Sequence, residues 1–325
     1  MNAKKKTNQL FQSKSTVLVF VLLFIASSIL FRDRNFLSST SVLNLLRKCC
    51  SDGGLLALGM AFVIIIGQID LSVGSVMALG GVVMGMVGAN HPILGILLGL
   101  ACGVACGMIS GLMVAKMRLS SWVATLAMML GIRALVMLMT NQKPVSISNP
   151  VLSALGGAKI FGINILIIIF FVLTFVCIFV GKHTRFGMAL YAVGGNEEAA
   201  RMMGLKVDKI KIAAYTICGT FAALAGMLLA SRLYTAQPTA GTSWETTAIA
   251  MCALGGIKLT GGEGRFSGAF FGILIVSLIN TIFNYIGSLN SWWQNIVMGI
   301  LILISIGLQS DVLREMLPFK KKVAA

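Results

Sequence analysis

The chain has 325 residues, of which 57% are hydrophobic and only 11% are charged, and its mean hydropathy is +0.93. Soluble globular domains carry charge on about 25% of their residues, so the composition excludes that class. The net charge of +16 is scattered between apolar runs, which argues against a nucleic-acid partner and for a signal of membrane topology. No polar stretch is long enough to fold around its own core, so we interpret residues 1–325 as one transmembrane domain.

The apolar runs predict an all-α, polytopic integral membrane protein with about ten membrane segments. Two of the runs, 55–66 and 246–257, are shorter than the ~20 residues that a perpendicular helix needs. We expect them either to extend into flanking polar residues or to be broken elements that line a cavity. The predicted segments are residues 16–30, 55–66, 71–87, 93–115, 122–139, 163–180, 212–230, 246–257, 266–286 and 292–308.

Basic residues are distributed unevenly between the two sides of this arrangement. With the amino terminus inside, eighteen lysines and arginines fall inside, seven fall outside and Arg133 lies within a span. The positive-inside rule therefore predicts that both termini and the polar stretch 181–211 are cytoplasmic. We expect Arg133 to face a cavity or to extend its charged end to the inner surface.

Residues 67–74, GQIDLSVG, interrupt two apolar runs with a carboxylate. An ionisable residue at membrane depth is a functional candidate, because burying it unpaired is costly. Asp70 and Ser72 are therefore candidates for a translocation path or its gate. Asp70 could equally cap the following helix by accepting hydrogen bonds from its first backbone N–H groups. The sequence leaves both interpretations open.

Glycine recurs at every fourth position along the run 93–115. Small residues at this spacing let another helix backbone approach closely, so the ladder predicts helix packing. Its members are Gly95, Gly99, Gly103, Gly107 and Gly111.

The seven cysteines and two histidines form no pattern typical of a metal site. Cys102 and Cys106 share a helix face, but neither histidine is placed to complete a ligand set, so we predict no metal. The adjacent pair Cys49 and Cys50 has no explanation in the sequence. Paired carboxylates, H-E-x-x-H and a serine elbow are missing, which favours a protein that is not an enzyme.

The stretch 181–211 holds the longest water-compatible sequence between apolar runs. We expect Gly194 and Gly195 to form a turn, and Asn196 to cap a helix of about two turns that starts at Glu197. Glu197 and Glu198 would suit the positive end of its dipole, and Gly204 would stop it by adopting a left-handed conformation. So short a helix is unstable alone in water and must dock against something larger.

Residues 236–245, AQPTAGTSWE, join two spans on the predicted outer side. Their amides, hydroxyls and single aromatic ring suit a polyhydroxylated ligand, and Gln237 and Glu245 are candidates for the path. A loop with a tryptophan at the membrane interface is an equally good interpretation. Residues 255–262 partly repeat the pattern of residues 67–74, which is a possible internal repeat of the kind common in transporters. The chain contains no G-x-x-x-x-G-K-[ST] sequence, so any nucleotide chemistry must come from a partner.

Four of these stretches together resemble the permease subunits of ribose-type monosaccharide ABC importers. Glu198-Ala199-Ala200 followed by Gly204 is similar to the E-A-A-x-x-x-G coupling motif, although the downstream I-x-L-P portion is missing. The other matches are GQIDLSVGS, in which Gln68 replaces a second glycine, AQPTAGT and LGGIKLTGGEGR. The resemblance covers nearly the whole chain and implies a fold like that of type II ABC-importer permeases.

The resemblance implies a membrane complex of several subunits in the bacterial inner membrane. Two permeases pair, as a homodimer or with a sister permease, an extracytoplasmic binding protein delivers ribose or a similar aldose, and a separate ATPase holds ATP and Mg²⁺, so that this chain binds no cofactor. The ATPase would grip the short helix and its caps, at Gly195, Asn196, Glu197, Glu198, Ala200, Arg201 and Gly204.

The main alternative is an ion-coupled secondary transporter of a small polar solute. Such a carrier needs intramembrane acids or a proton relay, and beyond Asp70 and the boundary residue Glu245 the predicted spans contain none. A membrane scaffold or receptor without substrate flux is a further alternative.

Overall fold

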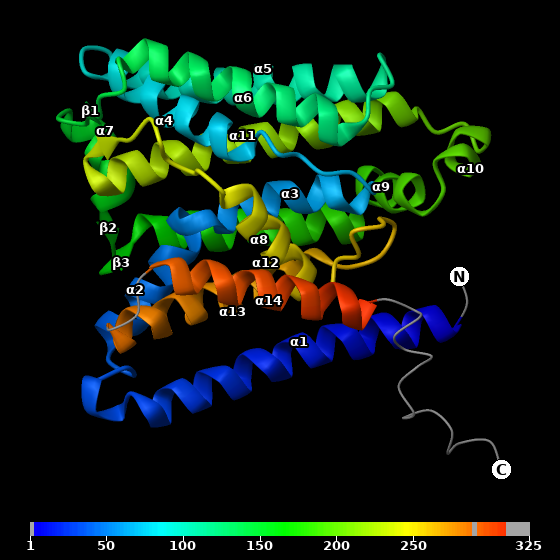
Figure 1. Ribbon diagram of the computed structural model, residues 1–325, viewed down its shortest axis with the longest axis horizontal. Helices are drawn as coiled ribbons and strands as arrows, with labels where there is room; N and C mark the ends of the chain where they lie inside the picture. Colours follow the sequence, from blue (N-terminus) through cyan, green and yellow to red (C-terminus); the bar gives the residue numbers. More distant parts are fainter. Residues whose placement is uncertain (1–2, 288–290, 310–325) are drawn as a thin grey trace.

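A computed structural model describes residues 3–287 and 291–309 of the chain. Within these residues, helices of similar direction lie side by side, and four very short strands form two antiparallel pairs at one end (Figure 1). The α-helices are α1 (Ala3–Leu30), α2 (Ser39–Cys49), α3 (Leu55–Ile65), α4 (Val73–Gly88), α5 (Pro92–Ala115), α6 (Ser121–Thr140), α7 (Pro150–Gly157), α8 (Ile165–His183), α9 (Arg185–Gly195), α10 (Glu197–Met202), α11 (Val207–Leu233), α12 (Trp244–Leu254), α13 (Phe266–Ile286) and α14 (Ser291–Gln309).

The strands are antiparallel pairs of two residues each. β1 (Val145–Ser146) pairs with β4 (Thr235–Ala236), and β2 (Lys159–Ile160) pairs with β3 (Ile163–Asn164). They add nothing to the membrane layer itself, so the predicted all-α, polytopic class is confirmed.

Each of the ten predicted membrane segments lies on a helix. Among the described residues, α5, α6, α8, α11 and α13 are long and apolar enough to cross a membrane. Four shorter apolar helices account for further segments, and the segment predicted at 246–257 falls on α12, which has only 11 residues.

The short run at 55–66 is the second half of a longer helical path. α2 passes directly into a π-helical turn, η2 (Cys50–Gly54), which passes directly into α3. A single π turn inside an α-helix is a local widening that often marks functional segments. Cys49 and Cys50, which the sequence left unexplained, are buried at this junction.

α11 is the central helix and packs against α3, α4 and α5 (Figure 1). The glycine ladder of α5 faces α4 and α11. A Cβ atom at any of its five positions would lie no more than 2.8 Å from a heavy atom of these two helices. The close backbone approach therefore depends on the absence of side chains along this face of α5.

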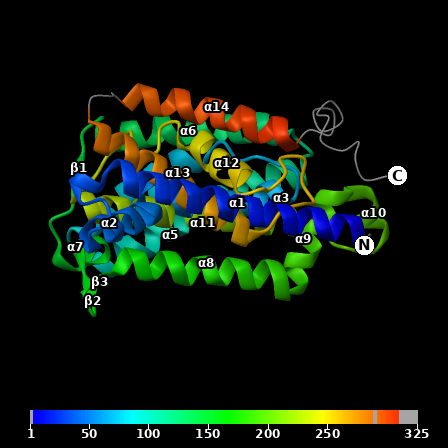
Figure 2. The same cartoon turned by 90° about the horizontal axis from the view of Figure 1, so that it is seen from below.

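The two ends of the helix layer differ in structure. α7, the strand pair β1–β4 and the hairpin β2–β3 lie at one end, which we call the hairpin end, and α9 and α10 lie at the other, the α10 end (Figures 1 and 2). α1 begins and α14 ends toward the α10 end in both views. The beginning and end of the described chain thus share a side with α10.

Candidate functional sites

α10 is a six-residue helix with both ends capped. The Asn196 side chain accepts a hydrogen bond from the Ala199 backbone N–H at 2.9 Å. At the other end Gly204 has φ +82°, its N–H donates to the Arg201 carbonyl at 3.0 Å, and the Leu205 N–H donates to the Ala200 carbonyl at 3.1 Å. These two bonds form a Schellman motif, which satisfies the last carbonyls of the helix. The cap and the stop lie where the sequence predicts them.

Ion pairs fasten α10 to the start of α11. Lys211 Nζ lies 2.6 Å from Glu197 Oε2, and the Arg201 guanidinium lies 3.1 Å from the Asp208 carboxylate. Lys116, just after α5, binds the other Asp208 oxygen at 3.0 Å. α10 is therefore connected by charge to α11 directly, and to the end of α5 only through Asp208.

The predicted grip residues divide between the two faces of α10. Ala200 is fully buried and Glu197 is turned toward Lys211, so these two residues face the body of the protein. Glu198 is exposed and makes no hydrogen bond or ion pair within the described residues. The other exposed members of the predicted set are Gly195, Asn196, Arg201 and Gly204.

Two methionines that the sequence analysis missed are exposed at the end of α10. Met202 is 86% exposed and Met203 is 70% exposed. The signal was available, because both are large apolar residues in a stretch that the sequence predicts to be exposed to water. Exposed methionines are adaptable contact residues and are frequent at binding surfaces.

Gly194 and Gly195 do not form the predicted turn, since both belong to the last turn of α9. The Cα of Gly194 approaches the end of α3 and the loop after α12. A Cβ at Gly194 would meet the Ile65 carbonyl oxygen and would lie 2.6 Å from the Gly262 nitrogen. The Gly262 N–H donates to that same Ile65 carbonyl at 2.8 Å. The turn prediction is wrong because glycine is needed here for close packing and not for a bend.

Asp70 and Ser72 build the turn between α3 and α4. Asp70 Oδ1 accepts hydrogen bonds from the Ser72 backbone N–H at 2.9 Å and from the Ser72 hydroxyl at 2.6 Å. Both side chains are 1% exposed, and the Tyr215 hydroxyl donates to the neighbouring Ile69 carbonyl at 3.3 Å. In this conformation Asp70 stabilises the entry to α4 and lies in the interior.

The two segments of the possible internal repeat contact each other. Each follows a helix of 11 residues, α3 in one case and α12 in the other. Gly67 and Gly261 both have positive φ, and a Cβ at Gly261 would lie 2.6 Å from the Gly67 Cα. The contact suits a repeat, which itself stays a prediction.

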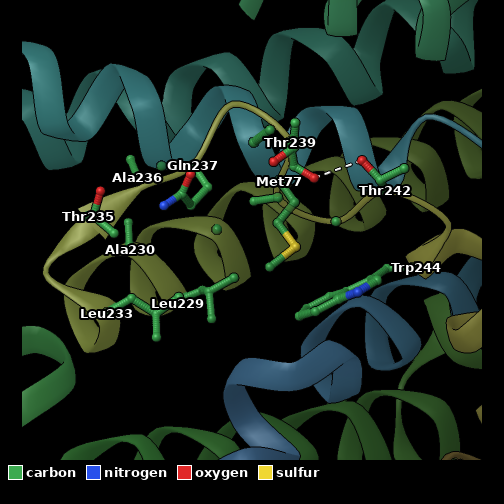
Figure 3. Close-up of a pocket in the computed structure, with 15 residues that line it drawn as sticks. Met77, Leu229, Ala230, Leu233, Thr235, Ala236, Gln237, Thr239, Thr242 and Trp244 are labelled. Atoms are coloured by element: carbon green, nitrogen blue, oxygen red, sulfur yellow. Dashed lines mark hydrogen bonds between the residues drawn. The ribbon is translucent and has the colours of Figure 1, made fainter. Parts of the chain in front are cut away.

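A cavity of about 260 Å³ lies between α4, α11 and the loop that joins β4 to α12. Figure 3 shows Met77 and Trp244 on one side of the opening and the side chains of Gln237, Thr239 and Thr242 along the loop. The Thr242 hydroxyl donates to the Thr239 carbonyl at 2.7 Å. An aromatic face opposite hydroxyls and an amide can bind a small polyhydroxylated molecule.

Of the four predicted path residues, only Gln237 lines this cavity. Asp70 and Ser72 lie in the interior, and Glu245 is on the first turn of α12 with its carboxylate next to Gly74. Arg133 is not among the residues that line this cavity. Its Nη1 donates to the carbonyls of Pro238 at 2.6 Å and Ala240 at 2.9 Å, because the loop offers free acceptors within its reach.

Comparison with known proteins supports the family suggested by the motifs. The family model described as branched-chain amino acid transport system / permease component matches residues 41–306. The ribose import permease protein RbsC of Bacillus subtilis (strain 168) is 43% identical over 293 residues, 89% of either chain. RbsC of Escherichia coli (strain K12) is 38% identical over 303 residues, which cover 91% of this chain and 93% of that protein.

A third relative carries a different sugar in its name. The L-arabinose ABC transporter permease protein AraH of Azospirillum brasilense is 35% identical over 300 residues, 92% of this chain and 87% of that protein. No solved structure matches the chain. The resemblance to ribose-type permeases is confirmed, and the chain belongs to the branched-chain amino acid transport system / permease component family.

Proposed function

We propose that this chain is the membrane subunit of an ATP-driven importer that passes ribose or a similar aldose across the bacterial inner membrane. The α10 end faces the cytoplasm and binds a separate ATPase, which holds ATP and Mg²⁺ and performs all hydrolysis. An extracytoplasmic binding protein delivers the sugar to the hairpin end. The observation that carries this proposal is the capped, ion-paired α10, whose outward face has no partner of its own within the described chain.

The contact with the ATPase is assigned to Glu198, Met202 and Met203. The methionines offer apolar area that is costly to leave in water, and Glu198 offers an unpaired charge for specificity. Glu197, Arg201 and Asp208 have a different role, since they transmit force from α10 to α11 and α5. This division distinguishes the residues that bind from those that connect.

The cavity beside Trp244 is assigned to the sugar path. Its lining combines an aromatic ring, an amide and hydroxyls without a charged group, which suits a neutral sugar. The loop leads from the hairpin end back toward the middle of the molecule, where α12 starts (Figure 1). The path therefore descends from the hairpin end along α4 and α11.

A second permease subunit covers the face that carries this loop. Thr239, Thr242 and Ser243 are exposed there, on a loop that lies beside the apolar helices α4 and α6. Lipid chains offer no hydrogen bonds to such groups, so protein or water of the path must face them. Two permeases that meet at this face enclose a polar path between them.

The function is tested by reconstitution in liposomes with the ATPase and the binding protein that co-purify with a tagged chain. ATP supplied on the side of the liposome membrane where the ATPase lies should drive uptake of labelled ribose from the other side. Glu198→Lys should reduce uptake at least tenfold and weaken retention of the ATPase. Asp33→Lys, an exposed charge reversal just after α1 at the opposite, hairpin end, is the control for ATPase binding and should retain the ATPase as wild type does.

Two results would contradict the proposal. Normal uptake in Glu198→Lys would remove α10 as the coupling site. Uptake that a protonophore abolishes at constant ATP, by a chain that purifies without an ATPase, would instead identify an ion-coupled transporter.

A further inference from the structure

Arg133 is the only charged residue of α6, a helix apolar and long enough to span the membrane. Its side chain is half-buried and points at the loop between β4 and α12. A guanidinium at this depth is costly unless its donors and its charge are satisfied, so a retained arginine requires specific partners. Those partners are the carbonyls of Pro238 and Ala240.

The hydrogen bonds of the loop alternate between two sources. The carbonyls of residues 237, 239 and 241 accept the backbone N–H groups of residues 240, 242 and 244, at 3.0, 3.3 and 3.1 Å. The carbonyls of Pro238 and Ala240, which lie between them, accept from Arg133 at 2.6 and 2.9 Å. Arg133 thus supplies the hydrogen-bond donors that the backbone of the loop does not offer to these two carbonyls. An unsatisfied carbonyl is costly inside a membrane.

A carboxylate on α12 acts on Arg133 at longer range. Glu245, on the first turn of α12, attracts the guanidinium electrostatically, although within the described residues the two form no direct ion pair. Its Oε2 also lies close to Gly74, at the start of α4. Arg133 therefore links α6 to the loop directly and to α12 through charge.

The loop held in this way covers Met77. Met77 is fully buried, lines the cavity and lies below the loop, where a Cβ at Gly241 would be 3.1 Å from its sulfur (Figure 3). Thr242, on the same loop, is already exposed. Movement of the loop would therefore uncover Met77 and change little at Thr242.

We propose that Arg133 is a positioning residue that latches the loop 237–243 over the cavity and thereby controls access to it. The role of the cavity in sugar transport rests on the function proposed above. The latch itself rests only on the two carbonyl bonds and on the cover that the loop gives to Met77.

The test measures thiol labelling of the full chain in nanodiscs, without substrate. Met77→Cys reports the covered position and Thr242→Cys the exposed one, and labelling of the seven native cysteines is subtracted with the parent protein. Adding Arg133→Met should speed labelling of Met77→Cys by about tenfold or more, since hydrogen bonds from a charged donor shift an equilibrium by about that factor each. Labelling of Thr242→Cys should stay within about twofold in the same comparison.

Arg133→Lys keeps the charge but lacks the planar fork of donors, so Met77→Cys should be labelled at an intermediate rate in this variant. Arg133→Lys also provides the test if Arg133→Met fails to assemble. Glu245→Gln keeps both carbonyl bonds and should have a smaller effect than Arg133→Lys. Unchanged labelling of Met77→Cys in both arginine variants would overturn the latch. If labelling changes as expected but wild type transports no pentose or hexose, the latch stands and the proposed function fails.

Discussion

A Cβ atom at Gly241 would lie 2.8 Å from the backbone carbonyl oxygen of Gly74, so the two glycines pack backbone against backbone. Gly74 ends the GQIDLSVG segment and Gly241 belongs to AQPTAGT, two motifs far apart in the sequence. Their contact joins the start of α4 to the loop that forms the cavity wall. The two motifs therefore belong to one structural unit.

Gly74→Ala should disrupt this unit. The new methyl group would overlap the Gly241 carbonyl and approach Glu245, and such overpacking costs about 1–3 kcal/mol. We expect a lower Tm in detergent and a loss of most sugar uptake. Gly299→Ala on α14 is the control, because a Cβ there would meet nothing within 4 Å. A Tm in Gly74→Ala equal to that of the control would show that the loop yields without cost.

Gly194→Ala should uncouple ATP hydrolysis from transport. Gly194 is where α9 contacts the Ile65 carbonyl and the Gly262 backbone, and a methyl group there would separate α9 from the α3–α4 turn. The exposed face of α10 is untouched, so the ATPase should still bind and hydrolyse ATP while uptake falls at least severalfold. The measurement is the ratio of sugar imported to ATP hydrolysed in proteoliposomes.

The neighbouring glycine provides a matched control. A Cβ at Gly195 would meet nothing within 4 Å, so Gly195→Ala should leave the ratio unchanged. Equal ratios in both variants would argue that force reaches the spans through the ion pairs with α11 and not through α9.

The sequence predicted elements whose signals are local. Runs of apolar residues located the spans, and the cap at Asn196 and the stop at Gly204 fixed α10, because a cap needs only its own neighbours. The conformation of Gly194 depends on its packing against Ile65 and Gly262, which are distant in sequence. The local preference of glycine for turns was therefore misleading.

The orientation of the side chains on α10 and the partners of Arg133 could not be predicted from the sequence, for the same reason. The motif placed Ala200 and Glu198 together in the ATPase grip, but tertiary packing buries one and exposes the other. Arg133 has backbone carbonyls as partners, which carry no signature in the sequence. The continuation of α3 into α2 was also hidden, because the π turn at residues 50–54 is polar and glycine-rich and resembles a break.

Met202→Ala should weaken binding of the ATPase without affecting the fold. Burial of a methionine side chain is worth about 1.5–3 kcal/mol, which corresponds to a loss of about tenfold or more in affinity if Met202 enters the interface. The dissociation constant for the purified ATPase, measured in nanodiscs, gives the value. Met86→Ala at the end of α4 removes another exposed methionine and should not change affinity. An affinity change below twofold in Met202→Ala would exclude this side chain from the contact.

The Glu197–Lys211 pair should be worth more than the Arg201–Asp208 pair. The Lys211 side chain is 9% exposed and its partner Glu197 is 43% exposed, whereas Arg201 and Asp208 are 52% and 24% exposed, so solvent screens the pair without a buried member more strongly. Double-mutant cycles on the free energy of unfolding should give about 1–2 kcal/mol for Glu197→Gln with Lys211→Met, and less than about 1 kcal/mol for Arg201→Gln with Asp208→Asn. Added salt should reduce the second value first. Equal coupling energies would mean that water reaches Lys211 as freely as it reaches Arg201, and α10 would then be held to α11 chiefly by the burial of Ala200.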